Sequence, residues 1–142
     1  MDKELVVGSQ LTQEMCDTGR YMLEQLDIND CQVVGALWFY FSEGQEWKYI
    51  VSTPLLKSSG PKEIYRIIDR INEGASGKTI SLNSILMAQP NHPLIELLSY
   101  SFGTGEGISG VRFSNNTING QVIEDAFIYR MKRPNTEVNA TP

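Results

Sequence analysis

The chain has few of the residues that build metal sites and disulfide frameworks. Its 142 residues include one histidine, His92, and two cysteines, Cys16 and Cys31. A single histidine cannot supply a two-histidine metal site, and the separation of the cysteines does not match zinc-finger spacing. Two cysteines also fall short of the disulfide framework of a small secreted domain. We therefore expect no metal site, no cofactor and two buried free thiols.

Long apolar runs and an excess of positive charge are also missing. No stretch approaches the ~18 apolar residues that span a bilayer. The charged start, Met1-Asp2-Lys3-Glu4, does not resemble a signal peptide. The net charge of −5 disfavours a phosphate-tracking surface, because nucleic-acid binding depends on clustered Lys and Arg. The sequence therefore predicts a cytoplasmic protein that binds neither membranes nor nucleic acids.

The negative charge is concentrated in the first third of the chain. Residues 1–46 carry nine acidic and two basic side chains, whereas residues 47–142 carry a net charge of +2. We interpret this acidity as a solvated helix face, and a site for a basic partner stays open as the alternative.

Two glycine-containing segments resemble nucleotide-binding loops without completing the motifs. Gly77-Lys78-Thr79 ends like a phosphate-binding loop, but Asn72 occupies the first glycine position of that motif and the segment follows a helix. The loop Gly103-Thr104-Gly105-Glu106-Gly107 follows a helix and precedes a strand, which reverses the dinucleotide-binding order. We interpret the first as a helix-terminating loop and the second as a hinge or loop, with Gly105 as a candidate ligand contact.

A catalytic constellation is not evident in the sequence. Glu124 and Asp125 are neighbours on a predicted strand, so they are expected to point to opposite faces and not to act jointly as acid and base. One of them is expected to pair with Arg112 or Arg130. No serine stands in a G-x-S-x-G elbow. An enzyme of unidentified class, using His92, Cys31 or the Glu124/Asp125 region, remains an alternative.

The most informative feature of the sequence is a predicted hairpin rich in aromatic residues. Two predicted strands, 32–42 and 46–53, flank the polar turn Ser42-Glu43-Gly44-Gln45. Strand periodicity places large apolar residues on both faces: Trp38, Tyr40, Trp47 and Tyr49 on one, and Leu37, Phe39, Phe41 and Ile50 on the other. A sheet with one wet face would alternate apolar with polar residues. We therefore expect both faces to be covered.

The turn length also predicts which residues face each other across the hairpin. With four residues in the turn, we expect Tyr40 to lie opposite Tyr49 and Trp38 opposite Val51. Such cross-strand pairs each contribute roughly 0.2–1 kcal/mol.

Helical spacing and capping residues predict three helices. The first begins after Ser9 or Thr12 and runs to about Leu26, with Gly19 on its buried stripe suggesting close approach to a sheet. The second spans 61–74, and the third spans about 92–101 with His92 as a cap. Further strands are predicted at 110–115 and 121–131, and residues 79–88 fit either a strand or a helical turn.

Together these elements predict an α+β fold. The expected architecture is an antiparallel sheet of four to five strands, built from two hairpins, with about three helices packed on it. We expect a single α+β domain over residues 1–132 and a flexible C-terminal tail over 133–142.

The hairpin region also resembles a known group of proteins. The pattern is Ala36-Leu37-Trp38 with the aromatic residues after it, Trp47, Ser52-Thr53-Pro54-Leu55, and Gly60-Pro61 followed by Tyr65 and Ile68 on the next helix. Over about residues 11–71 it resembles a small uncharacterised bacterial protein family with no assigned activity. The resemblance implies a compact bacterial cytoplasmic domain and carries no activity, cofactor or catalytic residue.

Three functional hypotheses follow. The first is a non-catalytic protein-interaction or accessory domain, with a homodimer or another protein as partner, because aromatic residues are enriched at interfaces. The second is a small-ligand sensor with a pocket between its layers. The third is the enzyme described above. For the first two, the candidate interface or ligand residues are Trp38, Tyr40, Trp47, Tyr49 and Gly105.

Overall fold

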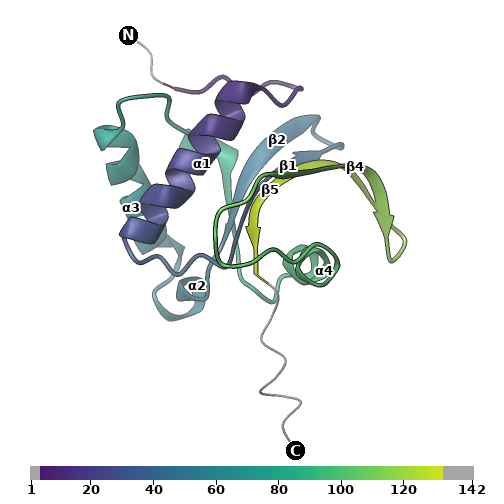
Figure 1. Ribbon diagram of the computed structural model, residues 1–142. Helices are drawn as coiled ribbons and strands as arrows, with labels where there is room; N and C mark the ends of the chain where they lie inside the picture. Colours follow the sequence, from purple (N-terminus) through teal and green to yellow (C-terminus); the bar gives the residue numbers. More distant parts are fainter. Residues whose placement is uncertain (1–3, 133–142) are drawn as a thin grey trace, which may run out of the picture.

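A computed structural model describes residues 4–132 of the chain (Figure 1). These residues form four α-helices, one short 3-10 helix and five strands. The helices are α1 (Gln13–Ile28), α2 (Leu55–Ser58), α3 (Pro61–Gly74) and α4 (Pro93–Ser101). The strands are β1 (Gly35–Phe41), β2 (Glu46–Ser52), β3 (Ile85–Ala88), β4 (Val111–Ile118) and β5 (Gln121–Met131).

The fold is α+β, as predicted, but the sheet is mixed. Its strand order is β3-β2-β1-β5-β4, and β3 runs parallel to β2 while the other neighbours are antiparallel. The expectation of a purely antiparallel sheet is therefore wrong at this pair. The chain leaves β2 through α2 and α3 before it forms β3, and such a crossover returns the chain in the same direction.

Two local assignments are settled at the same edge of the sheet. Residues 82–84 form the 3-10 helix and residues 85–88 form β3, so the ambiguous segment holds a turn of helix followed by a strand. The helix α2, which begins directly after Pro54, was not predicted because four residues carry no helical periodicity.

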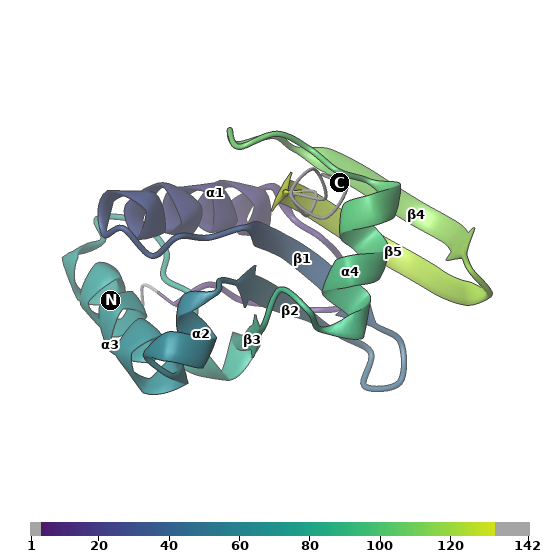
Figure 2. The same cartoon turned by 90° about the horizontal axis from the view of Figure 1, so that it is seen from below.

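Helices cover both faces of the sheet. Helices α1 and α3 lie on one face, and α4 crosses the other (Figures 1 and 2). The α1-side core includes Met15, Trp38, Trp47, Tyr49, Ile64 and Tyr129. The α4-side core includes Leu37, Ile50, Leu98, Ala126, Ile128 and Met131. The predicted division of the hairpin between two covered faces is confirmed, and the covering comes from this chain itself.

The hairpin pairs in a different register from the expected one. Trp38 lies opposite Tyr49, and Tyr40 lies opposite Trp47. The residues that flank a four-residue turn pair with each other, here Phe41 with Glu46. In this pairing each partner on β2 lies two residues earlier than predicted. It brings the Trp38 and Tyr49 rings into an edge-to-face arrangement with their centroids 5.2 Å apart.

The first helix approaches the sheet closely, as Gly19 predicts. Thr12 caps α1 by accepting a hydrogen bond from the Met15 N–H at 3.1 Å. A Cβ atom on Gly19 would collide with the Tyr129 hydroxyl and would lie 2.7 Å from Trp38 Nε1. A residue without a side chain is therefore required at this contact.

Strand β5 carries a bulge that changes where its last residues point. Ala36 pairs with Arg130 and Leu37 with Ile128, which leaves Tyr129 as an extra residue on β5. Tyr129 belongs to the α1-side core, and Met131 belongs to the α4-side core although it lies two residues further on. Arg130 is thereby turned to the same side as Tyr129, where it reaches Asp27 at the end of α1.

A second irregularity bends the outer hairpin. Ala126 and Ile123 both pack in the α4-side core at an odd spacing, as do Phe113 and Ile118 on β4. Regular alternation forbids this. Asn115, whose φ is +53°, lies where the facing of β4 reverses, and the hairpin curls around α4 (Figure 1).

Three further observations complete the fold. The described part of the chain contains no helix that is long and apolar enough to cross a membrane. His92 caps α4, with Nδ1 accepting from the Leu94 N–H at 3.1 Å, as predicted. The predicted tail over 133–142 lies outside the described residues.

Candidate functional site

Two of the predicted site residues are structural anchors. Trp38 and Tyr49 have no exposed surface. Trp38 Nε1 donates to the Met15 carbonyl at 2.8 Å, and the Tyr49 hydroxyl donates to the Gly19 carbonyl at 2.7 Å. Burial raises the pKa of Tyr49 well above its usual value, so the hydroxyl stays a donor. Neither side chain can touch a ligand or partner in this structure.

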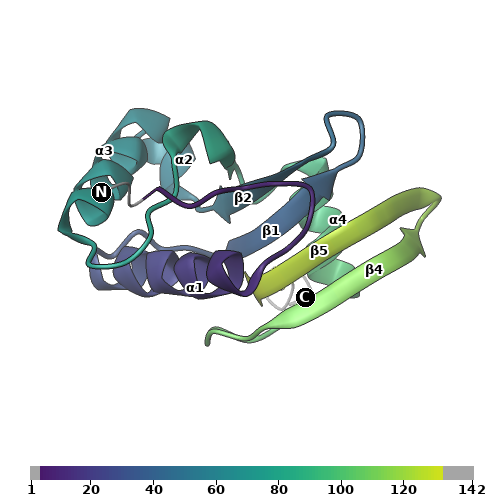
Figure 3. The same cartoon turned by 90° about the horizontal axis from the view of Figure 1, so that it is seen from above.

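The other two aromatic candidates line a shallow groove. Tyr40 is half-buried and Trp47 is almost completely buried, with their ring centroids 5.5 Å apart. The groove has a volume of about 260 Å³. We call it the aromatic groove, and its lining is Ser9, Tyr40, Trp47, Ser114, Asn115, Glu124 and Asp125. Figure 3 shows that the strands around it extend beyond the helices on the α1 side.

The two neighbouring carboxylates meet in this groove, which corrects a prediction. Glu124 and Asp125 were expected on opposite faces, but both line the aromatic groove. The reversal of facing near Asn115 is the physical reason, because two consecutive residues of β5 point to one side there.

Asp125 is held by an arginine, as the sequence predicts. Arg112 donates to both oxygens of Asp125, at 3.0 and 2.6 Å, and the Ser114 hydroxyl adds a third bond at 3.0 Å. These hydrogen bonds, with the charge of Arg112, lower the pKa of Asp125 despite its partial burial. The pair is half-exposed and ties β4 to β5.

The remaining candidates are scattered over the molecule. Gly105 has open space where a Cβ would stand. Cys16 is half-buried and Cys31 is buried; both are free thiols, and burial raises the pKa of each. Lys78 lines a cavity of about 320 Å³ beside α1, 4.0 Å from the Glu14 carboxylate.

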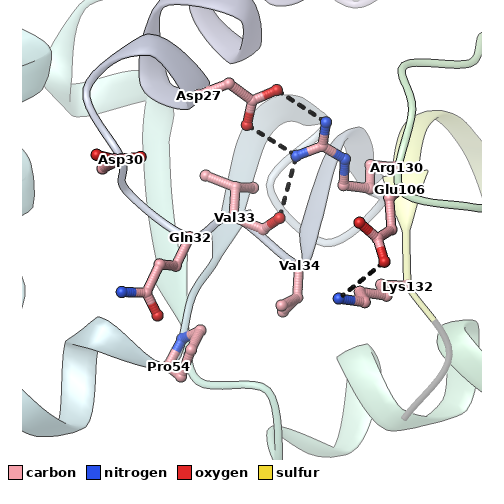
Figure 4. Close-up of a pocket in the computed structure, with 9 residues that line it drawn as sticks. All are labelled: Asp27, Asp30, Gln32, Val33, Val34, Pro54, Glu106, Arg130 and Lys132. Carbon is pink, nitrogen blue, oxygen red and sulfur yellow. Dashed lines mark hydrogen bonds and ion pairs between the residues drawn. The ribbon is translucent and has the colours of Figure 1, made fainter. Parts of the chain in front are cut away.

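A larger cavity lies where β1 begins and where β2 and β5 end. Its volume is about 560 Å³ (Figure 4). We call it the strand-end cavity, and its lining is Asp27, Asp30, Gln32, Val33, Val34, Pro54, Glu106, Arg130 and Lys132. The lining comes from the end of α1, the segment that enters β1, the end of β2, the loop after α4 and the end of β5.

Arg130 is the central polar residue of this cavity. Its side chain is only 8% exposed. Nη1 and Nη2 donate to the two oxygens of Asp27 at 2.9 and 2.8 Å (Figure 4). Nη1 also donates to the Val33 carbonyl at 3.1 Å, and Nε donates to the Gly107 carbonyl at 3.2 Å. One guanidinium therefore joins α1, the entry to β1 and the loop after α4.

The entry segment is held in an unusual backbone conformation. Asp30 and Gln32 have φ values of +57° and +52°. Residues other than glycine seldom adopt this left-handed region. The segment is fixed by the Cys31 N–H, which donates to the Leu26 carbonyl at 3.0 Å, and by the Thr53 hydroxyl, which donates to the Cys31 carbonyl at 2.7 Å.

The charges around the cavity are mostly paired. Asp27 pairs with Arg130, and Glu106 pairs with Lys132 at 3.6 Å. Asp30 has an exposed carboxylate with no ion pair among the described residues. The lining therefore has one negative charge in excess.

Sequence reasoning missed this cavity. Arg130 was named only as a partner for Glu124 or Asp125, because nothing in the sequence signals a bulge at Tyr129. Regular alternation would have placed Arg130 and Tyr129 on opposite faces. The available signal was the polar turn Asp27-Ile28-Asn29-Asp30 after α1, where two carboxylates stand close in sequence.

Neither a metal site nor a known relative adds an assignment to these residues. Within residues 4–132, no group of three or more His, Cys, Asp or Glu side chains is arranged to hold a metal ion. Comparison of the chain with protein-family models, with curated proteins and with solved structures found no match.

Proposed function

We propose that the protein is a small-ligand-binding domain and that the ligand occupies the strand-end cavity. The observation that carries the proposal is a cavity of about 560 Å³ with a buried, hydrogen-bonded arginine in its wall. This volume falls within the range of about 300–1,000 Å³ that is typical of concave small-molecule sites.

Two backbone features support this location. The bulge at Tyr129 turns Arg130 toward the cavity, and bulges occur often beside binding sites because they re-aim side chains. The left-handed residues Asp30 and Gln32 lie on the cavity wall, and backbone conformations of this kind cluster at ligand sites.

Binding fits the lining better than catalysis does. Four of the five charged side chains in the lining form two ion pairs. None of the nine described lining residues is a serine, threonine, cysteine or histidine. A site of this kind can orient a polar molecule, and it offers no activated nucleophile.

The test is a thermal-shift screen of polar metabolites against the full chain, followed by a variant that fills the cavity. Val34→Trp should abolish the stabilisation by any hit, because the indole would occupy the cavity without removing a charged residue. Val122→Trp is the matched control, because Val122 is 71% exposed on the distant hairpin. A ligand at a hundred times its Kd should add about 2.7 kcal/mol to the free energy of unfolding. A screen without hits, or a hit that binds Val34→Trp unchanged, would refute the proposal.

A second proposal is that the protein interacts with a protein partner or a second copy of itself at the aromatic groove. It is favoured by the convergence of Tyr40 and Trp47 with Glu124 and Asp125 on a part of the sheet that no helix covers. Aromatic rings beside carboxylates suit a basic side chain. Both proposals assume a bacterial cytoplasm, where Cys16 and Cys31 would remain thiols.

Light scattering over a range of concentrations tests the homodimer. Glu124→Lys should weaken any association that the wild type shows, and Glu73→Lys on the outer surface of α3 serves as the control. A monomer at high micromolar concentration that also fails to bind a lysine-rich peptide would count against this second proposal.

A further inference from the structure

We propose that the ligand of the strand-end cavity is a zwitterion that carries an ammonium and a carboxylate group, as a free amino acid does. The inference rests on the proposed function and names the chemical class of its ligand. It is carried by the distribution of paired and unpaired charge around the cavity.

The acidic side of the cavity calls for a cation. Both oxygens of Asp27 accept hydrogen bonds from Arg130, so that carboxylate is already neutralised. Asp30 is the charged lining residue without an ion pair among the described residues. Its position is fixed, because its N–H donates to the Asp27 carbonyl at 3.0 Å and its backbone is left-handed. An ammonium group would compensate the one excess negative charge.

The basic side of the cavity can accept an anion. The Lys132–Glu106 pair is long at 3.6 Å, and the two side chains are 47% and 83% exposed. Exposed pairs of this kind contribute little to stability, so a ligand carboxylate can replace Glu106 at low cost. Figure 4 shows Lys132 and Asp30 on different walls, at the end of β5 and at the entry to β1.

Arg130 adds a donor to the lining of the cavity. Hydrogen bonds within residues 4–132 account for four of its five N–H groups and leave one on Nη2. The guanidinium is almost completely buried, and a buried donor without a partner is unfavourable. Arg130 and Lys132 both line the cavity, so it holds two cationic side chains, of which only Lys132 is loosely paired.

Ligands with a single sign of charge fit less well. A dianion would face three carboxylates, from Asp27, Asp30 and Glu106. A simple amine would satisfy Asp30 and leave the Nη2 donor unpaired. A zwitterion can place its ammonium group beside Asp30 and its carboxylate beside Lys132.

Isothermal titration calorimetry of the full chain with the free amino acids tests the inference. For the amino acid that binds best, we expect its decarboxylated amine and its deaminated carboxylic acid each to bind at least about tenfold more weakly, since each loses one charge-assisted hydrogen bond. Dipeptides form a separate arm, which distinguishes a free amino acid from a peptide with the same two groups.

Two variants test whether the ligand's ammonium group binds beside Asp30 and its carboxylate beside Lys132. Asp30→Asn should weaken the binding of the amino acid and of its amine by about tenfold, and it should leave the binding of the carboxylic acid unaffected. Lys132→Gln should weaken the binding of the amino acid and of the carboxylic acid, and it should leave the binding of the amine unaffected. Asp69→Asn and Lys57→Gln, at exposed positions outside the cavity lining, are the matched controls and should change nothing.

The outcomes separate this inference from the proposed function. A ligand that Val34→Trp excludes, but that is neutral or carries one sign of charge, would overturn the zwitterion and leave ligand binding standing. Amino-acid binding that both Asp30→Asn and Lys132→Gln leave intact would also overturn it. A chain that binds no member of the panel, amino acids included, would overturn both.

Discussion

Three buried aromatic side chains fasten the sheet to the backbone of α1. Trp38, Tyr49 and Tyr129 donate to carbonyls of Met15, Gly19 and Cys16, at 2.8, 2.7 and 2.6 Å. Each carbonyl oxygen has a second lone pair beyond the one used in the helix. The contact depends on Gly19, because a side chain there would keep the rings away from the helix.

Gly19→Ala should therefore destabilise the protein. The added methyl group meets the Tyr129 hydroxyl and Trp38 Nε1, which are both fixed by hydrogen bonds. Overpacking of a core costs about 1–3 kcal/mol, and better helix propensity returns up to about 1 kcal/mol. We expect a net loss of about 1–2 kcal/mol in urea unfolding. Gly74→Ala at the end of α3, where a Cβ meets nothing, should be neutral or slightly stabilising.

Ser52→Ala should stabilise the protein. Ser52 is fully buried at the end of β2, and its hydroxyl has no hydrogen-bond partner among the described residues. Removal of an unsatisfied buried hydroxyl should increase the free energy of unfolding by about 1 kcal/mol.

Thr53, the residue after Ser52, has a hydroxyl that is hydrogen-bonded, so its removal should have the opposite effect. The Thr53 hydroxyl donates to the Cys31 carbonyl and accepts from the Leu55 N–H at 3.1 Å. Thr53→Val keeps the shape and should cost about 1–2 kcal/mol. Equal losses for Thr53→Val and Ser52→Ala in the same urea titration would contradict this account.

At the scale of elements, two departures from regular strand geometry decide what the site contains. The bulge at Tyr129 brings Arg130 to the end of α1, and the reversal of facing near Asn115 brings Glu124 and Asp125 together. Helix α3 shows the opposite case, because Pro61 and Gly74 predicted its bounds and its isoleucines at helical spacing predicted its buried face. Periodicity reports regular elements well and contains no information about an inserted residue.

The β4–β5 hairpin should show a pH dependence that originates in the Arg112–Asp125 pair. The hydrogen bonds from Arg112 lower the pKa of Asp125 in the folded state. The stabilisation is therefore present above the unfolded carboxyl pKa of about 3.9, and it is lost as the pH falls through the lower folded pKa. Arg112 is 49% exposed, so the contribution is about 0.5 kcal/mol.

Urea unfolding of Arg112→Gln at several pH values measures this contribution. The variant should be less stable than the wild type at pH 7, and the difference should shrink as the pH falls below the unfolded carboxyl pKa of about 3.9. Lys57→Gln, at an exposed position on α2, should show no such trend. A difference for Arg112→Gln that is constant with pH would show that the arginine acts through packing alone.

At the scale of the molecule, Arg130 joins segments that are distant in the sequence. It connects α1, the entry to β1 and the loop after α4, and the Thr104 hydroxyl adds a bond from the Met131 N–H at 2.8 Å. The Asp27–Arg130 ion pair therefore helps to hold three walls of the strand-end cavity together.

Asp27→Asn should loosen these walls together. It leaves the Arg130 charge buried without its counter-ion, and loss of one partner of a buried pair costs about 3–5 kcal/mol. Because Asp27 is 39% exposed, we expect about 2 kcal/mol. Amide exchange should accelerate in residues 29–34 and 103–110. Glu106→Gln, which affects a highly exposed pair, should leave both quantities almost unchanged.

The sequence by itself determined the class of fold, most elements and the two covered faces of the aromatic hairpin. These features follow from local periodicity, capping residues and glycine or proline positions, which act over a few neighbours. It also predicted an arginine partner, Arg112 or Arg130, for one of Glu124 and Asp125, because a carboxylate on a covered face needs a counter-charge. The structure shows that the pair is Arg112 with Asp125.

Only the tertiary structure decided the parallel pairing of β3, the hairpin register and the strand-end cavity. The cavity assembles Asp30, Glu106 and Arg130 from segments that are up to a hundred residues apart. Their proximity depends on the strand order and on one extra residue in β5, and neither feature changes the hydrophobic periodicity of the sequence. For that reason the groups that hold a ligand in our proposal became visible only after the sheet was assembled.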